Sequence, residues 1–347
     1  GAFVLAALLE TDVPRVHCLV RGTDDAASRQ RLAEKLEAFG LGEVADDPRI
    51  EVLAGDVAAE RFGWSPAWYE AMAERIGRVI HVAASTSFFR PYRALRGPNV
   101  EGTQEALRFA CHGRAKAFDH VSTVGVFETL SPFTTPLDED SPLPPLAELA
   151  GDYARSKSAA ERLVGEAAKR GLRVRIHRPG RLAADRRRGA VNPEDIAVRL
   201  VRLCLDLGAL PDIDADIDVT PVDLVAEAIV RLGRAPGATG KAHHLFGASI
   251  LTLDEMRAWT RSTLPEIRTI PQAEWMACAA ELLLHEQPAL AAVLEPLLRE
   301  APQEASSLDV SSTRTWQLLA ELGLKRSQPN REWWSRVLER LTEESAH

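Results

Sequence analysis

The sequence predicts an α/β protein with a doubly wound parallel sheet and a smaller, mostly helical C-terminal lobe. Short apolar runs rich in Val, Ile and Leu alternate with helical stretches through the first half of the chain. Small or polar residues directly follow these runs, and the alternation gives way to helices in the C-terminal part. Ligands of such sheets bind beyond the carboxyl ends of the strands, so the residues there are the candidate site residues.

Composition excludes several classes of protein. With 347 residues, 46% of them hydrophobic, the chain can bury one large core or two modest ones. A net charge of −8 argues against a general nucleic-acid binder. The four cysteines lie far apart and lack metal-ligand spacing, so we expect no metal site. No membrane-spanning run or signal peptide is recognisable, and we therefore expect a cytoplasmic protein with no membrane partner.

The first elements resemble half of a dinucleotide site. Residues 1–10 predict an apolar helix, and residues 15–21 predict a strand that ends in a charged residue. This is the second half of a dinucleotide-binding βαβ unit, whose first strand and Gly-rich loop would precede it. Gly1 would be the last glycine of that loop and would let helix and strand approach closely. We expect the native polypeptide to continue upstream.

Arg21 ends that strand and indicates which dinucleotide binds. An acidic residue there would accept hydrogen bonds from a ribose 2′-hydroxyl, whereas an arginine suits a 2′-phosphate. The sequence therefore predicts NADP rather than NAD. Arg29 and Arg31 follow on the next helix, and either could close over the same phosphate. These arginines could also be ordinary surface residues, an alternative that is stronger for Arg31 than for Arg21.

Later strand ends supply further candidates for cofactor binding. The strand at residues 50–57 ends in Gly-Asp-Val, where Asp56 can bind the adenine amino group and Val57 can pack on the ring. The strand at residues 78–85 ends in Ala83 and Ala84, whose small side chains let a cofactor approach the backbone. Asn99 begins the next helix and is a further candidate. Residues 172–180 end in Arg-Pro-Gly, a turn in which Pro179 and Gly180 can pass beneath a nicotinamide ring.

Three residues form the predicted catalytic set. Thr123 follows the strand at residues 118–121, and Tyr153 precedes Lys157 by four residues, on one face of the helix predicted for residues 156–169. An ammonium beside a phenol favours the phenolate and makes its proton easier to donate. Thr123 could hydrogen-bond the same substrate oxygen. A Tyr–Lys pair could also be a solvated helix face, but the upstream hydroxyl and nucleotide pattern favour catalysis.

The remaining elements depart from the alternating pattern. Residues 131–149, rich in Pro and acidic residues, predict a loop that could be a lid or a plain surface loop. Asn192 is expected to cap a helix that ends near Gly208, and Thr252 to begin another with a capping box. Further predictions are a helix at 223–232, a strand at 241–246, and core positions for Trp275, Trp316, Trp333 and Trp334.

These elements predict two domains. Residues 1–190 would form the NADP-binding Rossmann domain, and residues 191–347 the substrate-binding lobe. Some segments of the lobe, about residues 215–247, would return to the sheet. Because the lobe would shape the substrate pocket, we expect substrate specificity to reside there.

Seven motifs together resemble one family. The chain is similar to the extended short-chain dehydrogenase/reductases, and more narrowly to the thioester reductase domains of nonribosomal peptide synthetases, polyketide synthases and carboxylic acid reductases. The Thr-Tyr-Lys set is shared by the whole superfamily, whereas the first and last motifs are more specific. The motifs are Cys18-Leu19-Val20-Arg21, Val52-Leu53-Ala54-Gly55-Asp56, His81-Val82-Ala83-Ala84, Pro98-Asn99-Val100-Glu101-Gly102-Thr103, Val121-Ser122-Thr123, Tyr153-Ala154-Arg155-Ser156-Lys157 and Thr220-Pro221-Val222-Asp223.

The resemblance implies NADPH-dependent reduction of an acyl or peptidyl thioester held on the phosphopantetheine arm of a carrier protein. Thr123 and Tyr153 would stabilise and protonate the oxygen of a tetrahedral hemithioacetal, whose collapse releases an aldehyde. Lys157 would bind the nicotinamide ribose hydroxyls and influence Tyr153. A second reduction would give an alcohol, and the sequence does not distinguish the two outcomes. The resemblance also implies a monomeric domain of a larger synthase.

Two departures and two rival functions remain open. The Gly-rich loop is absent apart from Gly1, and residues 85–89 do not match the family pattern after the two alanines. One rival is a nucleotide-sugar epimerase or dehydratase of the same superfamily, which would retain NAD, a cofactor that Arg21 disfavours. The other is a non-catalytic NADP-binding scaffold, against which the complete set of Thr123, Tyr153 and Lys157 argues.

Overall fold

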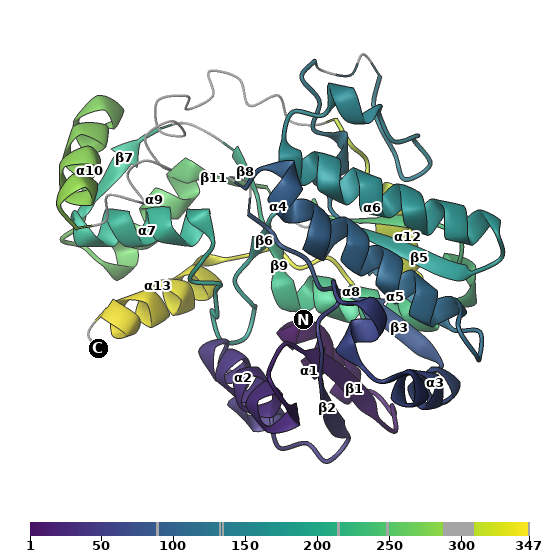
Figure 1. Ribbon diagram of the computed structural model, residues 1–347. Coiled ribbons are helices and arrows are strands. Elements are labelled where there is room, and N and C mark those ends of the chain that lie inside the picture. The colour runs from purple at the N-terminus through teal and green to yellow at the C-terminus, as the bar shows by residue number, and fades with distance from the viewer. Residues whose placement is uncertain are drawn as a thin grey trace. The chain divides into compact units, whose positions relative to one another are not determined.

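Two compact units make up the computed structural model (Figure 1), which describes residues 1–87, 90–131, 133, 135–213, 216–247, 250–286 and 309–345. The first, here called the sheet unit, comprises Gly1–Gly180, Asp223–Phe246 and Leu308–Arg326. The second, the helical unit, comprises Arg181–Val222, Gly247–Ser307 and Ser327–His347. The chain thus leaves the sheet unit at Gly180 and returns to it twice. Whether residues 1–190 and 191–347 are separate domains stays a prediction.

Parallel strands form the centre of the sheet unit. Four of them pair in the order β10-β5-β4-β3, and β1 and β2 form a separate parallel pair. The predicted α/β, Rossmann-type fold class is confirmed. Most of the strands are shorter than the sequence predicted, so most residues of the candidate site lie in loops just beyond them, while Pro179 is the last residue of β5. The strands are β1 (Val16–Val20), β2 (Ile50–Ala54), β3 (Arg78–His81), β4 (Ala117–Val121), β5 (Arg173–Pro179) and β10 (Ala242–Leu245).

Helices cover the sheet and complete its core. Side chains of α5 and α6, including Ala110 and Val164, pack against Phe118 of β4 and Val174 of β5, and the two helices lie side by side in Figure 1. Local capping starts several helices, as where Ser65 accepts a hydrogen bond from the Trp68 N–H. The helices of this unit are α1 (Ala2–Leu9), α2 (Asp25–Ala38), α3 (Pro66–Arg75), α4 (Tyr92–Arg96), α5 (Gly102–Cys111), α6 (Asp152–Lys169), α8 (Val222–Arg234) and α12 (Thr313–Glu321).

Short helical turns connect these elements. Their bounds are η1 (Gly42–Val44), η2 (Glu60–Gly63), η3 (Gly97–Glu101), η4 (Val124–Phe127), η5 (Leu146–Glu148) and η6 (Pro236–Ala238), of which η3 is a π-helical turn that runs into α5. The predicted catalytic helix begins at Asp152 rather than at residue 156. Tyr153 and Lys157 therefore belong to one continuous helix.

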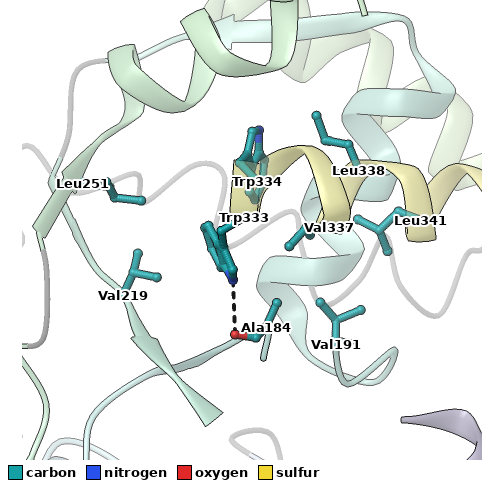
Figure 2. Packing of buried hydrophobic residues seen from close by; sticks show 9 residues of the cluster. All are labelled: Ala184, Val191, Val219, Leu251, Trp333, Trp334, Val337, Leu338 and Leu341. Atoms are coloured by element: carbon teal, nitrogen blue, oxygen red, sulfur yellow. Dashed lines mark hydrogen bonds between the residues drawn. The ribbon is translucent and has the colours of Figure 1, made fainter. Parts of the chain in front are cut away.

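The helical unit has a core of its own (Figure 2). Trp333 and Trp334 pack with Val337, Leu338 and Leu341 in that core, and the Trp333 indole donates to the Ala184 carbonyl oxygen at 3.4 Å. The unit contains α7 (Ile196–Asp206), α9 (Leu253–Thr263), α10 (Gln272–Glu286), α13 (Arg331–Ser345), β6 (Leu182–Ala183), β7 (Ala209–Asp212), β8 (Asp216–Asp218), β9 (Thr220–Pro221), β11 (Ile250–Thr252) and β12 (Arg268–Pro271).

The four tryptophans expected in the core are all buried. Trp316, however, belongs to the sheet unit, where its indole donates to the Phe246 carbonyl oxygen at 2.8 Å. The capping box at Thr252 is confirmed. The cap expected at Asn192 is wrong, because Asp195, an equally good capping residue, accepts the hydrogen bond from the Ala197 N–H instead. Among the described helices, none combines the length and the apolar character needed to cross a bilayer.

Candidate functional site

The carboxyl ends of parallel strands bring the predicted site residues together. Ala83, Thr123 and Pro179 lie at that edge of the four-stranded sheet, because β3, β4 and β5 run in the same direction. Arg21 and Asp56 lie at the corresponding edge of the β1–β2 pair. Residues far apart in the chain are thus collected at the strand ends, where ligands of such sheets bind.

A hydrogen bond connects the predicted catalytic helix, α6, to the end of β4. Lys157 is 3% exposed, and its Nζ donates to the Val121 carbonyl oxygen at 2.8 Å. Val121 precedes Thr123 by two residues, and Tyr153 lies one turn earlier on the same helix as Lys157. The structure therefore brings Lys157 to the strand end that carries Thr123.

The Thr123 hydroxyl is oriented by its own turn. Thr123 caps η4, and its Oγ1 accepts a hydrogen bond from the Gly125 N–H at 3.1 Å. Because the oxygen accepts this bond, the hydroxyl proton is free to be donated to another acceptor. Thr123 is half-buried. This geometry suits a residue that donates a hydrogen bond to a substrate oxygen.

The Tyr153 phenol holds its proton more tightly than the sequence predicted. Burial, and secondly the charge of Glu128, raise the pKa of Tyr153 to about 12. The expectation that Lys157 would lower this pKa is wrong, because burial outweighs any effect of the ammonium group. Tyr153 is therefore fully protonated near neutral pH, which suits a proton donor.

Lys157 is the buried cation of the site. Burial lowers the pKa of Lys157 to about 8, and the charge of Glu161 opposes this effect. On the neighbouring strands, burial and Lys157 lower the pKa of His81 to about 3 and hold the pKa of His120 well below its usual value. Both histidines are consequently neutral beside the ammonium group.

Glu128 was missed by the sequence reasoning. It directly follows η4, it is exposed, and its charge acts on Tyr153. A Cβ placed on Gly125 would lie 3.3 Å from both Glu128 Oε1 and Thr123 Oγ1, so the carboxylate and the hydroxyl approach the same glycine. The sequence signal that could have identified Glu128 is an acidic residue five positions after the threonine at a strand end.

Asp56 and Val57 lie in the loop after β2. Both are half-buried, and Asp56 Oδ1 accepts from the Ala58 N–H at 2.9 Å. A Cβ on Gly102, the first residue of α5, would come within 3.0 Å of Val57 Cγ2. Gly102 thus permits the close approach between this loop and α5, a contact that the sequence analysis did not predict. The role expected of Gly1, close packing of the first helix against a strand, stays a prediction.

The predicted phosphate-binding arginines are exposed. Arg21 directly follows β1, while Arg29 and Arg31 lie on α2. Burial raises the pKa of the Cys18 thiol on β1 to about 11, and Arg29 opposes this rise. The charge of Arg29 therefore acts on β1, and which of the two arginines supports Arg21 stays a prediction.

Asn99 connects the loop after β3 to the catalytic helix. Its Oδ1 accepts from the Ser85 N–H at 2.7 Å, and its Nδ2 donates to the Ser85 carbonyl oxygen at 3.0 Å and to Ser156 Oγ at 2.9 Å. Asn99 is 1% exposed. It therefore fixes the segment that contains Ala83, which is exposed, and Ala84, which is half-buried. Phe88 and Phe89, part of the segment that departs from the family pattern, lie outside the described residues.

The end of β5 and the acidic loop complete the surroundings. Pro179 is buried, and the Gly180 N–H donates to the Leu245 carbonyl oxygen at 3.4 Å. The loop at residues 131–149 contains the buried Leu137 and Glu139, and Glu139 accepts hydrogen bonds from the backbone and side chain of Thr315. Its described part is anchored and is therefore not a plain surface loop; whether it acts as a lid stays a prediction.

The side chains present fit a nicotinamide dinucleotide. The Lys157 ammonium has three protons, and within the described part of the chain its one hydrogen bond goes to Val121, which leaves donors for ribose hydroxyls. Arg21 presents an exposed guanidinium at the end of β1. A surface cavity of about 760 Å³, lined by Tyr69, Arg108 and other residues of η2, α3 and α5, contains none of the predicted site residues.

Comparisons with known proteins show the family of this chain. A family model described as male sterility protein, an NAD-binding model, matches residues 1–229. The chain is 32% identical over 311 residues to the non-canonical nonribosomal peptide synthetase FrzA from Cladobotryum sp, covering 86% of this chain and 30% of the relative. It is 28% identical over 342 residues to one of the subunits of the linear gramicidin synthase from Brevibacillus parabrevis, covering 98% of this chain and 7% of the relative.

A solved structure matches more completely. The terminal R domain from the myxalamid PKS-NRPS biosynthetic pathway superposes with a TM-score of 0.89 at 33% identity, covering 99% of this chain and 88% of that one. The chain thus spans less than a third of the length of the two curated relatives but most of the length of a single domain.

Proposed function

The chain belongs to the male sterility protein family of NAD(P)-binding domains, and on this basis we propose that it is an NADPH-dependent thioester reductase. It would release an acyl or peptidyl chain from a carrier protein as an aldehyde. The observation that carries the proposal is the hydrogen bond from Lys157 to Val121, because it joins the helix of Tyr153 to the strand end of Thr123. The similarity to a terminal R domain supports the same function.

Each member of the set has a separate task. NADPH, when bound, supplies the hydride. Tyr153 Oη donates a proton to the oxygen of the substrate carbonyl group as negative charge develops there, and its raised pKa keeps that proton available at neutral pH. Thr123 Oγ1 donates a hydrogen bond to the same oxygen. Lys157 donates to ribose hydroxyls and places a positive charge beside the reacting atoms.

The remaining residues would hold the cofactor. Arg21 would bind a 2′-phosphate, which favours NADPH over NADH, with Arg29 or Arg31 in support. Asp56 and Val57 would bind the adenine. The other predicted contacts, with the backbone and the nicotinamide ring, are Gly1, Ala83, Ala84, Asn99, Pro179 and Gly180.

The proposed partner is a phosphopantetheinylated acyl or peptidyl carrier protein. The two curated relatives named above are a non-canonical nonribosomal peptide synthetase and a subunit of a linear gramicidin synthase, and this chain corresponds to 30% and 7% of their lengths. A domain of a larger synthase would receive its thioester from a neighbouring carrier domain in the cytoplasm. Such a domain could stop at the aldehyde or reduce it further to the alcohol.

NADPH oxidation tests this function. The protein is given an acyl-pantetheine thioester and then the matching free aldehyde. Oxidation with the thioester that disappears in Tyr153→Phe supports the reductase, and oxidation with the aldehyde identifies the second reduction. Purified protein that retains NAD and oxidises no NADPH would favour a nucleotide-sugar enzyme. Protein that binds NADPH but stays inactive, even with a loaded carrier protein, would favour a scaffold.

A further inference from the structure

A buried ion pair lies one helical turn beyond the predicted catalytic residues. Arg178, the residue before Pro179 in β5, is 4% exposed, and Glu161 of α6 is 2% exposed. Arg178 Nε donates to Glu161 Oε1 at 3.1 Å, and Nη2 donates to the same oxygen at 2.5 Å. Glu161 follows Lys157 by four residues, so both lie on the same face of the helix.

The same guanidinium contacts two other elements. Its Nη1 donates to His244 Nε2 of β10 at 3.0 Å. Its central carbon lies 4.9 Å from the centre of the Phe127 ring, a cation–π contact. Phe127 is fully buried and is the last residue of η4, the turn that Thr123 caps. Arg178 therefore joins the catalytic helix to the turn of Thr123.

The hydrogen bonds around His244 have a fixed direction. Arginine can only donate, so Nε2 of His244 is the acceptor, and Nδ1 carries the proton that is donated to the Ser311 carbonyl oxygen at 2.7 Å. Burial lowers the pKa of His244, which agrees with a neutral ring. The His244 N–H donates to Thr315 Oγ1, which donates to Glu139. The acidic loop is thus connected to the same network.

A purely structural role is the simplest alternative. Buried ion pairs are commonly neutral for stability overall, although removal of one partner costs several kcal/mol. The position of this pair argues for more than that. The Glu161 carboxylate belongs to a residue one helical turn after Lys157. The Arg178 guanidinium packs on Phe127, in the turn that Thr123 caps, and the backbone of Arg178 continues directly into Pro179 and Gly180.

We propose that Arg178, through Glu161 and Phe127, is a positioning residue that fixes the spacing between Thr123 and the Tyr153–Lys157 pair. This inference rests on the proposed function for the identity of the catalytic set. Arg178 touches none of the reacting groups itself. It acts by holding two elements whose side chains must meet at one substrate oxygen, where a small displacement lowers the rate strongly.

The pair also sets the charge near Lys157. The titratable groups that act on or lie beside Lys157 are Glu161 and Tyr153 on α6, His81 on β3 and His120 on β4. Both histidines are neutral, and so is Tyr153 near neutral pH. The Glu161 carboxylate raises the pKa of Lys157, and the Arg178 guanidinium compensates that carboxylate. Removing either Arg178 or Glu161 therefore leaves the charge of the other residue uncompensated near Lys157.

The test compares four variants with the wild type. Arg178→Met is expected to lower kcat at least tenfold and to move the basic limb of the pH profile upward, because the lone Glu161 carboxylate keeps Lys157 protonated. Glu161→Gln is expected to move that limb downward. Arg178→Lys keeps the positive charge but loses the planar guanidinium that bonds both Glu161 and His244. It should therefore keep the basic limb at the wild-type pH but retain only part of the wild-type kcat. The double variant Arg178→Met/Glu161→Leu removes both charges and guards against unfolding of the single variants.

The double variant is expected to fold and to keep the wild-type KM for NADPH. The basic limb of its pH profile should stay at the wild-type pH, while its kcat stays below that of the wild type. A matched control is Glu227→Gln, which breaks the half-buried Arg231–Glu227 pair of α8 without touching α6 or η4 and should leave kcat and the limb unchanged. The proposal would be overturned if the basic limb of the pH profile moved in the same direction in Arg178→Met and Glu161→Gln. A double variant with the wild-type kcat would also overturn it. If the wild type reduces no thioester, the proposed function fails. The pH dependence of NADPH affinity, measured for the wild type and the same variants, then tests the effect of the Arg178–Glu161 pair on Lys157.

Discussion

Lys157 Nζ donates a hydrogen bond of 2.8 Å to the backbone carbonyl oxygen of Val121, 36 residues earlier in the chain. The bond joins the buried end of a helical side chain to the last residue of β4. Two residues after Val121, Thr123 accepts a bond from Gly125 and keeps its own hydroxyl proton for another acceptor. This bond therefore joins the helix that carries Tyr153 and Lys157 to the strand end that carries Thr123, and their joint action in catalysis stays a prediction.

Tyr153→Phe tests the proton donor. The substitution removes one oxygen, so we expect unchanged NADPH affinity and a turnover lower by a factor on the order of 10². The matched control is Tyr69→Phe, because burial also raises the pKa of Tyr69 to about 12 although it belongs to the separate cavity near α3. Steady-state rates and NADPH titration measure both effects. Wild-type turnover in Tyr153→Phe would remove this residue from its role.

Lys157→Met tests the cost of the buried ammonium. Burial lowers its pKa from 10.5 to about 8, which corresponds to a penalty on the order of 3 kcal/mol when the group is charged. The variant also loses the hydrogen bond to Val121, which reduces this gain in stability by about 1 kcal/mol. We expect the inactive variant to be more stable than the wild type at neutral pH, in the absence of cofactor.

The sign of the pH dependence follows from the lowered pKa of Lys157. Below pH 8 both folded and unfolded chains carry the proton, and the full penalty applies. Between about pH 8 and 10.5 the folded chain loses the proton first, so the unfolded chain binds more protons and this group's contribution to stability rises with pH. The advantage of Lys157→Met in denaturant unfolding should therefore shrink as pH rises from 8 to 10. A constant difference would contradict the buried charge.

Glu128→Gln tests the carboxylate beside the catalytic hydroxyls. The charge of Glu128 adds to the burial effect that raises the pKa of Tyr153, so its removal should lower that pKa. Spectrophotometric titration, with Tyr153→Phe subtracted, measures the shift. Glu148→Gln, a change at another exposed glutamate, the last residue of η5, serves as the control. An unchanged titration curve would show that Glu128 does not act on the phenol.

Arg21→Glu tests the choice of cofactor. A charged hydrogen bond to a 2′-phosphate contributes about 1.5–3 kcal/mol, so the KM for NADPH should rise by roughly one to two orders of magnitude. The KM for NADH should fall, because the introduced glutamate can accept hydrogen bonds from the ribose 2′-hydroxyl. Arg29→Ala and Arg31→Ala, compared under the same conditions, identify the second arginine, and Arg29 is expected to have the larger effect. Equal changes for both cofactors would count against a 2′-phosphate contact.

Gly102→Ala tests the close approach of α5 to the loop after β2. Its Cβ would come within 3.0 Å of Val57 Cγ2, so the loop must shift and cofactor affinity should fall severalfold. Gly165→Ala in α6 is the matched control, because its Cβ would meet nothing within 4 Å. That control should stabilise the protein by about 0.5–1 kcal/mol without affecting binding. Equal binding by both variants would exclude a role for the contact.

Much of this architecture was predictable because the signals are local. A buried parallel strand is a short apolar run, and the residue that follows it is adjacent in sequence, so Arg21, Asp56 and Thr123 could be located without coordinates. The four-residue spacing of Tyr153 and Lys157 and the capping box at Thr252 are likewise local patterns. The fold class and the choice of candidate catalytic residues were therefore determined by the sequence itself.

The tertiary structure decided what depends on contacts between distant residues. It returned residues 309–326 to the sheet unit with Trp316, and it placed Gly102 where α5 closely approaches the loop after β2. Desolvation raises the pKa of Tyr153, and no local pattern reveals how deeply a phenol is buried. The contacts of Arg178 with Glu161, Phe127 and His244 join four separate elements. Such effects arise from burial and packing, which exist only after the chain has folded.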